Sequence, residues 1–201
     1  MITVPPLRNV LNFSSGEMEP HREVVDQRLS GMGAAYADQE AVAALLGAGE
    51  DPVIYRAFDG KVPPHQAGHL AYRTTVVLPG EIGGEYYMTR GHHHDRDSAE
   101  LYLGMSGTGL MLMRNRDGDL CVEELSKNVT VYVPPGWAHR TVNTGSQEPM
   151  FLAVYFSDAG HDYGSVQQSG FGARVLVGGS GPEVVPAHAV LPAAGGSRAP
   201  T

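Results

Sequence analysis

Residues 91–100 read Gly-His-His-His-Asp-Arg-Asp-Ser-Ala-Glu. If this stretch begins as a strand, His92 and His94 point to one face and His93 points to the other, because side chains alternate along a strand. Two imidazoles on one face can reach a single ion. After a five-residue loop, Glu100 can add a carboxylate oxygen from the neighbouring strand.

Residues 134–143 supply a second stretch of the same kind, Pro-Pro-Gly-Trp-Ala-His-Arg-Thr-Val-Asn. The Pro-Gly pair predicts a turn, and His139 begins the strand that follows it. Three histidines and one carboxylate suit a single divalent metal ion with open positions: Fe, Mn, Ni or Zn. A triple histidine alone is weak evidence, since surface histidine pairs are common, and the second stretch is what strengthens the prediction.

Short strands separated by turns fill most of the chain after residue 51. Turn pairs such as Pro79-Gly80 and Asp117-Gly118 punctuate them. Even spacing without intervening helices favours a sandwich or barrel. The expected strands are Val53–Phe58, Leu70–Leu78, Glu85–Arg90, Glu100–Met105, Leu110–Arg114, Leu120–Leu125, Val129–Val133, His139–Asn143 and Met150–Phe156.

The composition divides the chain into three parts. Residues 1–50 are expected to form an N-terminal arm with one helix over Ala34–Leu46, where alanine, leucine and glutamate are frequent. Residues 51–177 are expected to form the β-barrel. Residues 178–201 are rich in glycine, alanine and proline and are expected to form a flexible tail.

Charge and cysteine content exclude several classes of protein. The net charge is −8 and no two lysines or arginines are adjacent, so nucleic-acid or anionic-membrane binding is not expected. No apolar run approaches the roughly 20 residues of a membrane span. Cys121 is the single cysteine, so an intrachain disulfide is impossible. The first 15 residues lack the features of a secretory signal, and a cytoplasmic location is expected.

Both stretches resemble the two sequence motifs of the cupins. Their order and the β-rich context predict an all-β cupin, a double-stranded β-helix or jelly-roll barrel with a short N-terminal helical arm. One departure is visible, because Tyr86 stands where the first motif opens with glycine, and Gly84 lies two positions earlier. The matching positions are His92, His94, Glu100 and Gly107, followed by Pro134, Gly136, His139 and Asn143.

A longer resemblance, over about residues 50–172, is to the archaeal-type cupin glucose-6-phosphate isomerase family. It implies a metal-dependent isomerase of glycolysis and gluconeogenesis that interconverts glucose 6-phosphate and fructose 6-phosphate, usually as a homodimer. The stretches that carry it are Thr75–Gly80, Gly84–His92, Glu100–Tyr102, Tyr132–Gly145, Phe151–Tyr155 and Asp158–Gly164.

The resemblance also implies roles for individual residues. The family's Thr-Lys-Gly-His has Arg90 in place of lysine here, which keeps the charge and changes its geometry. The loop between His94 and Glu100 is also one residue shorter than usual. The implied metal ligands are His92, His94, Glu100 and His139; the implied phosphate contacts are Thr75, Thr89 and Gly91; and Tyr102, Tyr155, His161 and Tyr163 line the sugar pocket. Because the net charge of −8 repels a dianion, Arg90 or Arg73 is a further candidate donor to the phosphate.

Aldose–ketose isomerisation moves hydrogen between C1 and C2, and its proton-transfer route needs a base. Glu100, His161 and a tyrosine such as Tyr155 are the candidates, whereas a metal-assisted hydride shift would need no strong base. Three other functions are compatible with the motifs: isomerisation or epimerisation of another sugar phosphate, a metal-dependent oxygenase, and a sugar-binding cupin without catalysis.

Overall fold

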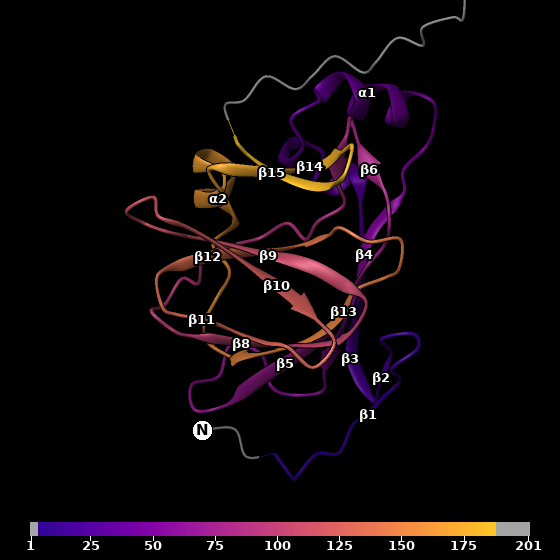
Figure 1. Ribbon diagram of the computed structural model, residues 1–201. Helices are drawn as coiled ribbons and strands as arrows, with labels where there is room; N and C mark the ends of the chain where they lie inside the picture. The colour runs from indigo at the N-terminus through magenta and orange to yellow at the C-terminus, as the bar shows by residue number, and fades with distance from the viewer. Residues whose placement is uncertain (1–3, 188–201) are drawn as a thin grey trace, which may run out of the picture.

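Two antiparallel sheets face each other in the computed structural model, which describes residues 4–187 (Figure 1). The larger has the strand order β11-β8-β13-β5-β4-β3 and the smaller has the order β10-β9-β12. Their bounds are β3 (His21–Arg28), β4 (Val53–Gly60), β5 (Leu70–Val77), β8 (Glu100–Ser106), β9 (Thr108–Asn115), β10 (Leu120–Ser126), β11 (Thr130–Val133), β12 (Trp137–Asn143) and β13 (Met150–Phe156).

The chain from β8 to β13 passes back and forth between these sheets, which is the connectivity of a jelly roll. β8 shows the expected alternation, with Tyr102 buried and Leu101 and Leu103 on the outer face. β9 is buried on both faces at Met111, Leu112 and Met113, which belong to a continuous apolar run. The predicted all-β jelly-roll class is therefore confirmed.

A third sheet, with the order β15-β14-β7-β6, covers one end of the barrel. The expected strand over 85–90 is reduced to β7, because the chain changes partners there. Glu85 pairs with Leu176, whereas Met88 bridges Val142 of the barrel. The bounds in this sheet are β6 (Glu81–Ile82), β7 (Glu85–Tyr86), β14 (Ala173–Gly178) and β15 (Gly181–Pro186).

The N-terminal fifty residues contain more structure than one helix. Val10–Leu11 and Met18–Glu19 pair as β1 and β2, and β3 pairs with β4 at the edge of the larger sheet. The helix α1 spans Gln39–Gly47, later than predicted, because Asp38 is its N-cap and accepts a hydrogen bond from the Ala41 amide. Two short 3₁₀ turns, η1 (Leu29–Gly31) and η2 (Gly33–Ala35), precede it.

The expected tail begins inside ordered structure, since β14 and β15 form a hairpin that extends to Pro186. Residues 188–201 lie outside the described part of the chain. Between the barrel and this hairpin lies α2 (Tyr163–Ser169), which the sequence analysis did not predict. Neither described helix is long and apolar enough to cross a membrane.

Candidate metal centre and adjoining cavity

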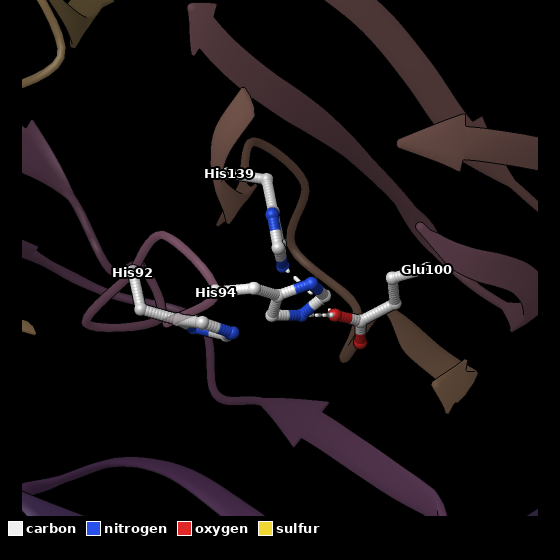
Figure 2. A group of neighbouring side chains, drawn as sticks. All are labelled: His92, His94, Glu100 and His139. Atoms are coloured by element: carbon white, nitrogen blue, oxygen red, sulfur yellow. Dashed lines mark hydrogen bonds and ion pairs between the residues drawn. The ribbon is translucent and has the colours of Figure 1, made fainter. Parts of the chain in front are cut away.

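Four side chains converge inside the barrel: His92, His94, Glu100 and His139 (Figure 2). One ligand atom from each lies within 4.8 Å of those from the other three. His94, Glu100 and His139 are buried, and His92 is half-buried. The structure thus brings together the four residues that the two sequence motifs single out.

Backbone hydrogen bonds hold the first and last of these histidines side by side. The His92 amide donates to the His139 carbonyl at 3.2 Å, and the His139 amide donates to the His92 carbonyl at 3.0 Å. The ring centroids lie 4.5 Å apart. The chain around His92 is extended, but it forms only two isolated bridges, from His92 to His139 and from His93 to Asp162. The strand expected here is therefore only a short extended segment.

The alternation predicted for the three histidines is nevertheless present. His93 turns away from the centre, and its Nδ1 lies 2.9 Å from the hydroxyl of Ser165 on α2. Its backbone pairs with Asp162, which begins the same helix. His93 therefore ties the metal-binding segment to α2.

The donor set fits a divalent metal ion. The Nδ1 atoms of His94 and His139 lie 2.9 and 3.3 Å from the carbonyl oxygens of Ser98 and Trp137. A carbonyl only accepts, so each Nδ1 donates its proton there and leaves Nε2 to face Glu100. Both Nε2 atoms lie 3.0 Å from one oxygen of Glu100. Either a proton on Nε2 or a metal ion must lie between each nitrogen and the carboxylate, and such carbonyl partners are typical of metal-binding histidines.

His92 gives independent support for this fit. Its Nε2 is buried and has no hydrogen-bond partner among the described residues. A buried polar atom without a partner costs about 1–3 kcal/mol, and a metal ion would satisfy it. Burial, followed by the charges of His139 and His161, holds the pKa of His92 well below 6.5, so the ring is neutral and able to ligate.

Glu100 remains ionised in spite of its position. Burial alone would raise the pKa of this carboxyl, but the charge and hydrogen bonds of His139 and His94 hold it well below 4.5. The pKa of His94 is raised: burial lowers it, and the hydrogen bonds to Glu100 and Ser98 together with the charges of Glu100 and Asp95 outweigh this. The centre therefore presents an anionic oxygen among three imidazole nitrogens.

A cavity of about 50 Å³ adjoins the centre. Every residue that the resemblance assigns to phosphate or sugar lies on its wall. The predicted residues on it are Thr75, Thr89, Arg90, Gly91, Tyr102, Tyr155, His161 and Tyr163, together with His92, Glu100 and His139.

Aromatic and imidazole rings form the part of the wall closest to the centre. The ring of His161 lies 4.4 Å from that of His92 and 5.6 Å from that of Tyr155. It stacks on Tyr163 at 5.9 Å with an interplanar angle of 11°. Burial lowers the pKa of His161 to about 4 and raises the pKa of Tyr155 to about 12, so both groups are neutral at neutral pH.

Three cavity residues were not among the predicted site residues, Tyr55, Phe151 and Ala153, and the candidate phosphate donor Arg73 also lies on the wall. Arg73 is fixed by an ion pair of 2.5 Å with Asp59, which is buried and also pairs with Arg22 at 2.6 Å. Strand alternation agrees with this position of Arg73, because it lies two residues before Thr75 on the same strand. Tyr55 on β4 carries no local signal that separates it from a core tyrosine.

The guanidinium of Arg90 already contacts other parts of the protein at the edge of the cavity. It donates to the Gly31 carbonyl at 2.6 Å and lies 5.1 Å from the centre of the Tyr163 ring. The side chain therefore spans from the cavity wall to the turn that ends at Gly31.

Comparison with known proteins gives one consistent result. The family model described as "Glucose-6-phosphate isomerase (GPI)" matches residues 26–187. The chain is 40% identical over 176 residues to "Glucose-6-phosphate isomerase" of Thermococcus litoralis, covering 87% of this chain and 90% of that protein. It is 41% identical over 172 residues to the protein of the same name from Pyrococcus horikoshii, covering 85% and 89%.

Similarity also extends to a bacterial protein and to solved structures. "Glucose-6-phosphate isomerase" of Sinorhizobium medicae is 34% identical over 168 residues, covering 83% of this chain and 78% of that protein. A solved oxalate oxidase superposes with a TM-score of 0.48 at 16% identity, over 57% of each chain.

Proposed function

This chain belongs to the glucose-6-phosphate isomerase family and interconverts glucose 6-phosphate and fructose 6-phosphate; we propose that it does so on one divalent metal ion held by His92, His94, Glu100 and His139. The observation that carries this assignment of the site is the convergence of four ligand atoms within 4.8 Å of one another, beside a cavity lined by polar side chains. When bound, such an ion polarises the carbonyl of the open-chain sugar and stabilises negative charge on the oxygens of C1 and C2.

Thr75, Thr89 and the Gly91 amide are proposed to bind the phosphate. The Thr89 hydroxyl oxygen accepts a hydrogen bond from the Thr141 amide at 2.9 Å, which leaves the hydroxyl proton free for a phosphate oxygen. Arg73 and Arg90 add positive charge to the same wall. Charge-assisted donors of this kind offset the repulsion of a dianion by a chain with net charge −8.

His161 and Tyr155 are proposed to handle the proton at C1 and C2. His161 is neutral and faces the cavity, so its ring can accept a proton from the sugar carbon. Tyr155 keeps its hydroxyl proton at neutral pH and can donate a hydrogen bond to a sugar oxygen. Glu100 is a weaker candidate base, because one of its oxygens already lies between two histidines.

Metal reconstitution tests the proposed site. Protein stripped of metal is loaded with Fe(II), Mn(II), Ni(II) or Zn(II), supplied with fructose 6-phosphate and followed through a coupled glucose-6-phosphate dehydrogenase. Activity should return with at least one metal, and no turnover with any of the four would refute the metal-dependent mechanism. Running the reaction in D₂O tests the two routes: solvent deuterium on C1 or C2 of the product indicates proton transfer, whereas a hydride shift requires that the substrate hydrogen be fully retained.

We also propose that two copies of the chain associate. Leu101, Leu103 and Tyr132 form an exposed apolar patch on neighbouring strands β8 and β11, with exposed fractions of 44%, 37% and 61%. Such patches commonly mark interfaces. Light scattering after size exclusion should give the mass of a dimer for the wild type and a lower mass for Tyr132→Glu.

A further inference from the structure

A second cavity, of about 230 Å³, adjoins the reaction cavity. The two share Arg90, Gly91 and Tyr163 in their lining. Other lining residues come from the turns around Gly31 and Gly33, from β7 and β12, from α2 and from β14. This space is larger than the reaction cavity of about 50 Å³ and has room for a small ion.

The walls of this second cavity carry an excess of positive charge. Arg90, Arg140 and Arg174 line it, against a single carboxylate, Glu85. That carboxylate is already engaged, because one of its oxygens accepts from Arg174 at 2.9 Å and from the Ala37 amide at 3.1 Å. The formal charge of the lining is therefore +2 when the cavity holds no anion.

Arg140 is the most deeply buried of the three arginines. It is only 8% exposed, and its guanidinium donates to the sulfur of Met88 and to the Arg90 carbonyl and stacks over the ring of Phe171. Within residues 4–187 no carboxylate is hydrogen-bonded to it. The charge of Glu85 acts on Arg140 as well as on Arg174, so one carboxylate is shared between two arginines.

The excess of positive charge restricts what the cavity can hold. The Nε atoms of Arg140 and Arg174 are buried away from solvent and have no acceptor among the described residues, so only the other guanidinium nitrogens could meet a ligand. An apolar ligand or a cation would leave the excess charge of the lining uncompensated.

We propose that this second cavity is a binding site for a small phosphate dianion, either inorganic phosphate or a compact phosphomonoester. A dianion matches the formal charge of +2 on the walls, and the planar guanidinium fork suits phosphate oxygens. The proposed site differs from the one that holds the phosphate of the sugar, because its lining contains Arg140 and Arg174 and lacks Thr75 and Thr89. Arg90 contributes to both walls, so the two sites share one cation.

Gln167 and Gln168 on α2 provide a matched pair of variants. Both are exposed, and only Gln167 lines the second cavity. Gln167→Glu places a negative charge at the cavity without removing any hydrogen bond described above, whereas Gln168→Glu adds the same charge one residue away. Metal-loaded protein is titrated with inorganic phosphate by isothermal calorimetry, and the titration is repeated with glycerol 3-phosphate to distinguish the free ion from an ester.

Two phosphate-binding events per chain are expected. Gln167→Glu should weaken one of them about tenfold, since a like charge close to a dianion repels it, and Gln168→Glu should leave both within twofold. Thr75→Val should weaken the other event, at the sugar phosphate site. A single event that responds to Thr75→Val alone would overturn the proposal, and so would equal weakening by the two glutamate variants.

Arg174→Met gives a second, independent variant. It should remove the event that Gln167→Glu weakens, in protein whose thermal unfolding shows that it is folded. Undiminished binding in folded Arg174→Met would contradict the proposal. Because binding is measured directly, this result does not depend on whether the isomerase assignment of the first cavity is correct.

Discussion

Gly91 is the residue where the backbone conformation of the site can be tested most directly. Its φ is +73°, a left-handed conformation that L-residues with a Cβ rarely adopt. A Cβ added there would lie 2.7 Å from an atom of the Phe171 ring and 2.9 Å from Cβ of Arg140. Gly91→Ala therefore combines backbone strain with a steric clash, one residue before His92.

The two contributions can be estimated separately. The left-handed conformation costs an alanine about 1–2 kcal/mol, and forcing a methyl group into a packed site costs about 1–3 kcal/mol more. Gly91→Ala should therefore reduce the free energy of unfolding by about 2–5 kcal/mol. Gly84→Ala is the matched control, because Gly84 has a φ of +79° and nothing lies within 4 Å of the added Cβ. Its free energy of unfolding should fall only by the contribution of the left-handed backbone.

Urea unfolding of the metal-free proteins measures both values, and calorimetric metal titration reports whether His92 is still correctly placed. Gly91→Ala should also bind the metal more weakly, since relieving the clash moves the segment that carries His92. The reasoning is refuted if Gly91→Ala is no less stable than Gly84→Ala and binds metal as well as the wild type does.

Three further predictions concern the histidines and α2. His139→Ala should lose bound metal on dialysis, as measured by elemental analysis, whereas His93→Ala should retain it; the reverse result would mean that the facing of the histidines is wrong. His161→Gln should lower kcat at least tenfold with little change in metal content, and unchanged kcat would exclude it as the base. Hydrogen bonds from the Ser165 amide and hydroxyl lower the pKa of Asp162 below 3.8. The ionised carboxylate therefore stabilises the fold above pH 3.8. This stabilisation is lost as the pH falls through the pKa of Asp162 in the folded state. The stability difference between wild type and Asp162→Asn, from urea unfolding, should accordingly shrink below pH 4, and a difference independent of pH would contradict this.

The centre was predictable because its signal is local. Residues 91–100 place two imidazoles on one side of an extended segment and return a carboxylate after a short loop, and the second motif supplies His139 after a Pro-Gly turn. The pattern holds although the segment is not a full strand, because alternation needs only an extended backbone. Two bridges to His139 and Asp162 are enough to fix it.

Other parts of the structure depend on contacts between distant residues and could not be predicted in the same way. Glu85 and Arg174 pair across 89 positions, and only the folded chain shows that this ion pair closes the third sheet over the second cavity. The helix α2 was missed because its seven residues show no apolar periodicity. Its one signal is the N-cap Asp162, which accepts from the Ser165 amide.

The net charge of −8 raises the question of how this chain attracts a sugar phosphate at all. At physiological ionic strength charges more than about 8 Å apart are largely screened, so the net charge of the surface matters less than the groups that line the cavity. Arg73 and Arg90 are both there, and each is held in place by an acceptor: Asp59 for Arg73 and the Gly31 carbonyl for Arg90. Since the carbonyl carries no net charge, Arg90 keeps its full positive charge for an anion, whereas Arg73 shares its charge with Asp59. Of the two, Arg90 therefore has the stronger electrostatic attraction for a phosphate, and it lies where both cavities can use it.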